Sequence, residues 1–167
     1  NGNTWLLNKY GPGGELLWSR TATSATGKPT QCHGLDIGPS GEIYAVGVET
    51  VVGEGANWLV QKLDSGGNPL WSRSYSGVAK ADDLAFGVAL LDTGDIAVVG
   101  WESYELNAYR WMVRAYTRDG DFLWSHVVEN TSGTAGLAND VAAGTDTCFA
   151  ACGTDAVPLE GVNWRVL

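Results

Sequence analysis

Histidine, the side chain best suited to proton transfer near neutral pH, occurs only at His33 and His126. Asp36 follows His33 closely, and this pair is the best candidate for a hydrolase or lyase site. A serine follows a tryptophan in three similar segments, at Ser19, Ser72 and Ser125. No repeated His or Asp accompanies these serines, which indicates a repeated hydrogen bond rather than a nucleophile. We therefore assign no catalytic residue and expect a protein that is not an enzyme.

A sugar-binding site is the alternative chemistry that the sequence suggests. An exposed tryptophan can stack on the apolar face of a sugar while neighbouring polar side chains bind its hydroxyl groups. Trp101 is the tryptophan with no counterpart elsewhere in the chain, and it stands beside Glu102, Tyr104, Asn107 and Tyr109. These five residues form the candidate binding site, although Trp101 packing beneath the connecting segment explains it equally simply. His33 joins the candidates because it precedes a strand that could line a central channel.

The sequence gives no metal site or cofactor site that we would assign. Carboxylates recur along the chain and would suit calcium, but their segments are too short for an EF-hand loop and are typical of turns: Glu49, Glu102, Asp155, Asp82, Asp83, Asp92 and Asp95. Cys148 and Cys152 are four residues apart on a predicted strand, roughly 13 Å at strand rise, which is too far for a disulfide. With Cys32 they are interpreted as small packing residues.

Charge and hydropathy exclude some partners. The net charge of −9 argues against a nucleic acid or an anionic membrane surface as ligand, because both select for clustered Lys and Arg. No apolar run of about 18 residues predicts a membrane span. The sequence starts at Asn1 without a recognisable signal segment, and we expect a mature product or part of a longer chain.

The whole chain is organised by a repeat of 53 residues without gaps. Tryptophans and glycines recur at this spacing, as Trp5, Trp58, Trp111 and Trp164, as Trp18, Trp71 and Trp124, and as Gly47, Gly100 and Gly153. The copies span approximately residues 4–56, 57–109 and 110–162, and residues 163–167 start a fourth. A period in this range is typical of solenoids, propellers and other arrays.

Each copy divides into four short strands joined by Gly/Asp-rich turns, and no segment has a helical period. The first strand carries the early tryptophan: Thr4–Tyr10, Trp58–Leu63, Trp111–Tyr116 and Asn163–Leu167. The second reads LLWSR, PLWSR or FLWSH: Leu16–Arg20, Pro69–Arg73 and Phe122–His126. The third and fourth are Leu35–Ile37, Val88–Leu91 and Val141–Ala143, then Ile43–Glu49, Ile96–Ser103 and Phe149–Asp155. Looser segments such as 74–83 and 104–110 connect them.

This arithmetic predicts an all-β fold made of β-propeller blades with four antiparallel strands, about three blades per chain. The tryptophan strand is apolar on both faces, with Trp58 and Val60 on one and Leu59 and Leu63 on the other, so we expect neighbouring sheets to cover both. A β-helix has far shorter coils, and a β-sandwich does not require such regular repetition.

The run DDLAFGVALLDTGDIAVVGW (Asp82–Trp101), with NWLVQKLDSGGNPLWS in the same phase, resembles the bacterial β-propeller repeats often called SBBP repeats. The last copy departs from that pattern at Gly144–Cys148. The resemblance implies a propeller from an exported or cell-surface bacterial protein, so we expect an extracellular location. That family has no agreed catalytic residues, and none is transferred.

Blade closure sets the expected partner. The third strand of each copy should lie nearest the propeller axis and the W-S-R strand outermost. Three blades are too few to close a ring, so we expect either a six-bladed homodimer, in which the N-terminal strands of each chain complete the last blade of the other, or a segment of a longer propeller. The residues at 163–167 would compete with Thr4–Tyr10 for the same position. The leading function is a scaffold that binds a protein or another ligand without catalysis, and the alternative is a carbohydrate-binding, lectin-like module.

Overall fold

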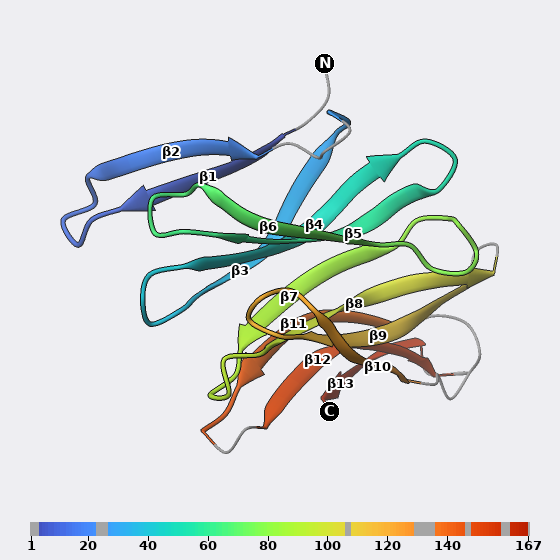
Figure 1. The fold of residues 1–167 in the computed structure, drawn as a ribbon. Coiled ribbons are helices and arrows are strands. Elements are labelled where there is room, and N and C mark those ends of the chain that lie inside the picture. The colour runs from blue at the N-terminus through green and yellow to red at the C-terminus, as the bar shows by residue number, and fades with distance from the viewer. Residues whose placement is uncertain are drawn as a thin grey trace.

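The computed structural model describes residues 4–22, 27–105, 108–128, 136–145, 148–157 and 161–166. Every regular element in these residues is a β-strand, which confirms the all-β prediction. The strands form four antiparallel sheets, and strands that are neighbours in the chain are neighbours in each sheet (Figure 1). In the same residues we find no helix of the length and apolar character that crossing a membrane would require.

The four sheets follow one another along the chain. The first contains β1 (Trp5–Tyr10) and β2 (Leu16–Ala22). The second contains β3 (Thr30–Ile37), β4 (Ile43–Val51), β5 (Gly55–Leu63) and β6 (Pro69–Tyr75). The third contains β7 (Leu84–Leu90), β8 (Ile96–Glu105), β9 (Ala108–Tyr116) and β10 (Phe122–Val128). The fourth contains β11 (Gly136–Ala143), β12 (Phe149–Val157) and β13 (Gly161–Val166).

All predicted strands are present in the predicted order, but the third strand of each copy begins earlier than predicted. Strands β3, β7 and β11 begin at Thr30, Leu84 and Gly136 rather than at Leu35, Val88 and Val141. Each carries a shift in its pairing with the next strand, in β3 between Cys32 and Gly34. Such a bulge adds one residue and breaks the apolar alternation that marks a strand in the sequence.

The connecting segment predicted at residues 104–110 is also shorter than expected. Strand β8 continues to Glu105 and β9 begins at Ala108, so most of this segment belongs to a hairpin. The pairs Glu102–Arg110 and Ser103–Tyr109 extend the ladder well beyond the apolar core. Polar cross-strand pairs stabilise a sheet as apolar pairs do, and hydrophobic pattern alone does not reveal them.

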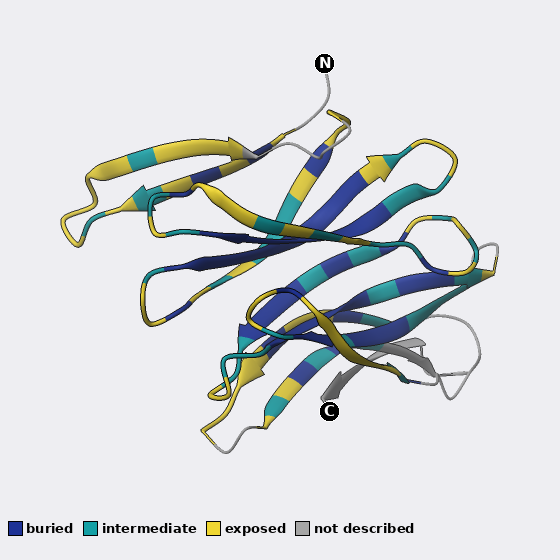
Figure 2. Ribbon diagram, in the orientation of Figure 1, coloured by how far each residue is buried: buried dark blue, intermediate teal, exposed yellow. Residues whose placement is uncertain are grey.

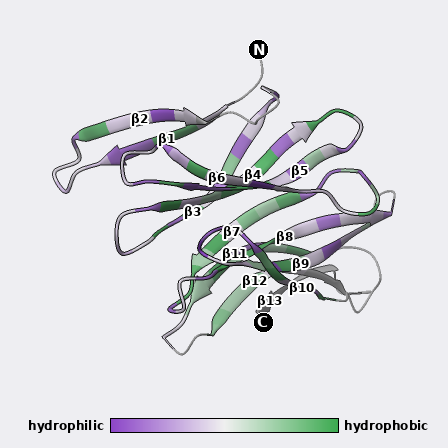
Figure 3. Cartoon of the chain, viewed as in Figure 1, coloured by the Kyte–Doolittle hydropathy of each residue, from purple (hydrophilic) through white to green (hydrophobic). Residues whose placement is uncertain are grey.

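Successive sheets pack face to face through their first strands. Strand β7 lies between β3 on one side and β11 on the other, so the third sheet is covered on both faces (Figure 1). Buried residues concentrate on β4, β5, β8 and β9, whereas β2 and β10 are largely exposed (Figure 2). Strand β7, which lies between β3 and β11, is also mostly hydrophobic in Figure 3, as a strand between two layers must be.

Each junction between sheets contains one apolar cluster, and each cluster contains one buried tryptophan, which comes from strand β1, β5 or β9. Trp5 lies between the first and second sheets, Trp58 between the second and third, and Trp111 between the third and fourth. Strand β5 contributes to two junctions. Trp58 and Val60 belong to the cluster between the second and third sheets, and Leu59 belongs to the cluster between the first and second. The prediction that this strand is covered on both faces is confirmed.

The repeated glycine of the fourth strand makes room for these tryptophans. A Cβ atom at Gly100 would lie 2.0 Å from the carbonyl oxygen of Leu84 and 2.9 Å from the Trp58 indole. The equivalent positions, Gly47 and Gly153, meet a carbonyl oxygen at 1.9 and 2.0 Å. No side chain fits there, so glycine is required by close approach of the neighbouring strand and ring.

Replacing Gly100 with alanine should therefore lower the free energy of unfolding by about 1–3 kcal/mol or more, because the sheet must move to admit a methyl group. Urea denaturation would measure this loss. Gly144→Ala is the matched control, since its Cβ would meet the Cys148 carbonyl oxygen at an ordinary 3.5 Å. Equal unfolding midpoints for the two variants would contradict the close-packing explanation.

Candidate functional site

The predicted sugar-binding residues lie on the β8–β9 hairpin, except Asn107, which is outside the described residues. The Trp101 and Tyr109 rings meet edge to face, with centroids 4.5 Å apart and planes at 65°. Trp101 pairs with Trp111 across the ladder, which puts both rings on the same face of the third sheet. Its backbone is also used, because the Trp58 indole donates a hydrogen bond of 2.9 Å to the Trp101 carbonyl oxygen.

Glu102 lies on the opposite face from Trp101 and is only 1% exposed. Arg110 reaches Oε1 of Glu102 with two nitrogens at 2.6 Å, and the Tyr75 hydroxyl donates to Oε2. The Arg110 guanidinium also covers the Tyr104 ring at 5.3 Å. Burial, and then the hydrogen bond to Glu102, raise the pKa of Tyr75 well above its ordinary value, which keeps the hydroxyl protonated as the donor. The carboxylate is neutralised within the fold and does not face a ligand stacked on Trp101.

A second buried carboxylate, Asp83, lies next to this ion pair. It is fully buried, and its two oxygens accept hydrogen bonds from the backbone N–H of Gly77 at 2.5 Å and of Ser103 at 2.9 Å. These bonds tie the segment between β6 and β7 to strand β8. Burial, helped by the nearby Glu102 charge, raises the pKa of Asp83 to about 6, although the two backbone hydrogen bonds lower it. Sequence reasoning named Asp83 only among carboxylates typical of turns and missed this cluster, although Asp83 departs from the repeat, with Thr30 and Gly136 at the equivalent positions.

His33 faces the neighbouring strand β7 rather than Asp36. Its Nδ1 lies 2.8 Å from the Ala85 carbonyl oxygen, and its ring stacks on Phe86 with centroids 4.8 Å apart. The Asp36 carboxylate instead accepts a hydrogen bond of 2.7 Å from the Leu90 backbone, five residues further along β7. The structure therefore engages the two side chains at separate backbone positions and does not bring the candidate hydrolase pair together.

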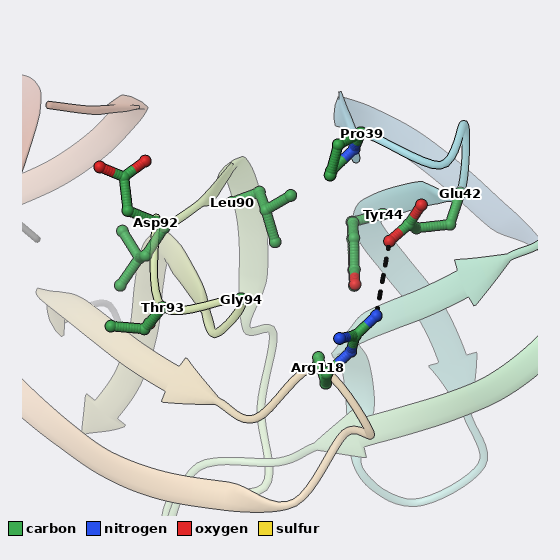
Figure 4. A pocket seen from close by; sticks show the side chains of 9 residues that line it. Pro39, Glu42, Tyr44, Leu90, Asp92, Thr93, Gly94 and Arg118 are labelled. Atoms are coloured by element: carbon green, nitrogen blue, oxygen red, sulfur yellow. Dashed lines mark ion pairs between the residues drawn. The ribbon is translucent and has the colours of Figure 1, made fainter. Parts of the chain in front are cut away.

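A pocket of about 460 Å³ opens between the second and third sheets (Figure 4). Glu42, Tyr44 and Arg118 lie on one side of it and Asp92 and Thr93 on the other (Figure 4). Glu42 comes from the turn before β4, Arg118 from the turn after β9, and Asp92 and Thr93 from the turn after β7. Three turns from two sheets thus converge on one opening, together with the apolar side chains of Pro39, Leu90 and Leu91.

The charges at this pocket are only partly paired. The Arg118 guanidinium is 61% exposed and lies 4.0 Å from the Glu42 carboxylate. The other Glu42 oxygen accepts a hydrogen bond of 3.1 Å from the Ser40 backbone. Beneath them, buried Lys62 donates to the Arg118 carbonyl oxygen at 3.0 Å and covers the Tyr44 ring at 5.0 Å. A carboxylate held by a backbone hydrogen bond and a solvent-exposed guanidinium are the groups that an incoming polar ligand can use.

Two of the positions that line this pocket hold different residues in the other copies. The position of Arg118 holds Ser65 in the preceding copy, and the position of Tyr44 holds Ala97 and Ala150 in the following ones. Sequence reasoning took these residues as ordinary turn and strand positions. Their departure from the repeat was the only signal available.

Other groups give no further site. In the part of the chain that the structure describes, no three His, Cys, Asp or Glu side chains gather closely enough to bind a metal ion. Cys32, Cys148 and Cys152 are free, and Cys148 is exposed, so its interpretation as a packing residue is wrong. Burial raises the pKa of Cys32 to about 11, which keeps it a neutral thiol.

Fold and sites together define an all-β protein of successive antiparallel sheets, with an opening of about 460 Å³ between the second and third sheets. No family model matches the chain, and no curated protein matches it. A crystal structure of a protein of unknown function from Bacteroides caccae is similar, with a TM-score of 0.53 and 10% sequence identity over 100% of this chain and 70% of that chain. At this identity the likeness shows a shared fold alone.

The Asp83 carboxyl predicts a distinct pH dependence of stability. Its folded-state pKa of about 6 lies above the ordinary 3.8, so the folded protein holds this proton between about pH 4 and pH 6 while the unfolded chain loses it. The free energy of unfolding should fall as pH rises through this range, by up to about 3 kcal/mol from this group. Asp83→Asn should remove that contribution.

Urea denaturation at closely spaced pH values would test this. The difference in unfolding free energy between the wild-type protein and Asp83→Asn isolates the group, and the exposed Asp119→Asn serves as control. A difference that stays constant from pH 4 to pH 6 would show that Asp83 ionises normally.

Proposed function

We propose that this chain forms about three blades of a β-propeller and acts as a binding scaffold rather than an enzyme. Several observations support the propeller arrangement. Each complete sheet is a four-stranded meander, the sheets stack in chain order, and strands β3, β7 and β11 contact one another at the junctions. A propeller places its innermost strands in this way.

The pocket at Glu42 and Arg118 is the binding site that the geometry supports best. Residues shared by the copies serve the packing between sheets, such as the tryptophans of the three clusters. Residues that differ between copies gather instead around the opening between the second and third sheets. Variation on a constant scaffold is the usual way in which repeat proteins acquire binding specificity.

We infer a protein segment as the ligand class for this pocket. Glu42 and Arg118 offer one charge of each sign, and Leu90 and Leu91 supply apolar surface. A sugar would require an exposed aromatic platform, whereas Tyr44 is fully buried under Lys62. The lectin alternative depends on Trp101 and stays a prediction. Glu102 lies on the opposite face of the sheet and could not bind a sugar stacked on Trp101.

A phage-displayed peptide library selected on the immobilised full chain would test the proposal. Peptides that bind should lose affinity by about tenfold in Arg118→Ala, because a charged hydrogen bond at the pocket rim is lost. The neighbouring exposed Asp119→Ala should bind like the wild-type protein. Selected peptides that bind both variants equally would place the site elsewhere, and a glycan array probed with Trp101→Ala beside the wild type would then test the lectin alternative.

A further inference from the structure

One contact between the outer parts of the sheets occurs twice within the chain, and it involves what we call the outer turn. An outer turn joins the last two strands of a sheet and ends in a glycine with positive φ, at +84°, +81° and +87° in the three copies: residues 11–14, 64–67 and 117–120. The same pair of backbone hydrogen bonds closes all three turns, with lengths of 2.8–3.0 Å. The three turns therefore have the same backbone shape.

The outer turn of the second sheet is seated on Trp18 of the first. The Trp18 indole donates to the Ser65 carbonyl oxygen at 3.3 Å, and Lys9 donates to the same oxygen at 3.2 Å. A Cβ atom at Gly67 would lie 3.1 Å from the Trp18 ring, so the glycine lies directly on the indole.

The outer turn of the third sheet is seated on Trp71 of the second in the same manner. The Trp71 indole donates to the Arg118 carbonyl oxygen at 3.1 Å, and Arg73 donates to the Gly120 carbonyl oxygen at 2.7 Å. Gly120 again lies on the ring, with a Cβ position 2.9 Å from the indole. Lys62 donates to the Arg118 carbonyl oxygen as Lys9 does to Ser65, so the tryptophan, the lysine and the glycine make equivalent contacts at both junctions, and Arg73 adds a bond at the second.

The third tryptophan of this series, Trp124, carries no seated turn among the described residues. It is 42% exposed and lines a groove of about 490 Å³ with Val113, Ser125, His126, Phe149 and Ala151, here called the Trp124 groove. Phe149 stacks on Trp124 with centroids 6.2 Å apart. Phe149 takes the position of Ile96, which packs in the cluster that Trp71 borders. The Trp124 groove is thus equivalent to the surfaces at Trp18 and Trp71, but no outer turn among the described residues lies on it.

At the opposite end of the array, the first outer turn lies on no tryptophan in the described part of the chain. Nothing lies within 4 Å of a Cβ position at Gly14, whereas Gly67 and Gly120 each face an indole. The first and fourth sheets lie at opposite ends of the molecule (Figure 1), so the turn at residues 11–14 and the Trp124 groove do not meet within one chain. One end presents the turn and the other presents the groove.

An exposed apolar surface lies on the two sheets at the same end of the array as the unseated turn. Leu6, Leu35 and Ile37 are 61%, 52% and 59% exposed, although they lie on strands β1 and β3. The other first strands, β7 and β11, lie against the sheet before them, whereas β3 has only weak contacts with β1. At the first junction, the face of β3 that a preceding sheet would cover is open to solvent. The exposed side chains there are apolar, which is typical of an interface.

We propose that the Trp124 groove binds the outer turn at Gly11–Gly14 of a second copy of this chain, head to tail. Trp124 then donates its indole N–H to the Pro12 carbonyl oxygen, as Trp18 and Trp71 do to Ser65 and Arg118. Strand β1 of the second copy pairs with β12 in the place of β13, because Trp164 of β13 pairs with Thr154 at the position that Trp5 would take. Strand β1 of the second copy is itself paired with β2, so β11 and β12 of one copy and β1 and β2 of the other form a four-stranded sheet.

Two such contacts close a ring of two chains. Each chain contributes its turn to one contact and its groove to the other, so the assembly has a two-fold axis and leaves neither surface free. The fourth sheet of one chain and the first sheet of the other become one blade, and the apolar face at Leu35 and Ile37 is covered. This inference rests on the two seated turns and does not depend on what the pocket at Glu42 binds.

Sedimentation velocity and light scattering on the full chain over a range of concentrations test the proposal. The wild-type chain should reach twice the monomer mass. Trp124→Ala removes the centre of the groove and should raise the dissociation constant by about thirtyfold or more, as expected for a buried tryptophan in an interface. Leu123→Ala, which removes an equally exposed side chain from the same strand, is the control, and circular dichroism would show that both variants are folded.

Gly14→Asn provides an independent variant at the turn. Asparagine tolerates positive φ, but its side chain would lie where the indole must lie, so this variant should also be monomeric. Because Trp124→Ala keeps an intact turn and Gly14→Asn an intact groove, a mixture of the two should form a dimer joined by one contact, weaker than the wild type. A monomeric wild-type chain at every concentration would overturn the proposal and leave the groove to the outer turn of a further repeat, and so would self-association that Trp124→Ala leaves unchanged.

Discussion

The burial of one indole at each junction between sheets is the constraint on which the rest of the structure depends. Burying a tryptophan side chain stabilises by about 2–3 kcal/mol, and the three junction clusters each contain one. The ring fits only because the facing strand carries glycine, as Gly100 does beside Trp58. At the central junction the Trp58 N–H donates to the Trp101 carbonyl oxygen, whereas the buried N–H groups of Trp5 and Trp111 have no hydrogen-bond partner among the described residues. An unsatisfied N–H costs about 1–3 kcal/mol, so the central junction should be the most stable of the three.

Trp18 and Trp71, on the outermost strands of their sheets, determine how successive sheets are oriented. Burial alone would allow sheets to pack in several orientations, but the bonds from Trp18 and Trp71 to a turn carbonyl oxygen fix one register. Arg73 and Lys62 hold the same turn from two further positions. Since every such contact joins the outer strand of one sheet to the turn of the next, the array has two different ends.

The sequence was sufficient to predict the strands, their order in each sheet and the two covered faces of β5, because the 53-residue period aligns each copy with two others. The opposite orientations of Trp101 and Glu102 also follow from strand geometry, in which consecutive side chains alternate, so grouping the two in one sugar site overlooked a rule that was available. The start of β3 and the pocket at Glu42 and Arg118 were not predictable. The first depends on a bulge that breaks alternation, and the second joins turns of different copies, whose meeting is decided by how sheets stack.

Differences between copies also set the strength of the contact at the Trp124 groove. In the seated turns, Lys62 and Arg73 supply charged donors in addition to the Trp71 indole. The third copy has Ala115 and His126 at these two positions, so the groove keeps the indole but loses the lysine and exchanges the arginine for an imidazole. Each charged hydrogen bond contributes about 1.5–3 kcal/mol, and a contact with fewer of them is weaker than those within the chain. In the proposed dimer, the junctions inside each chain are permanent, whereas the junction between chains responds to protein concentration.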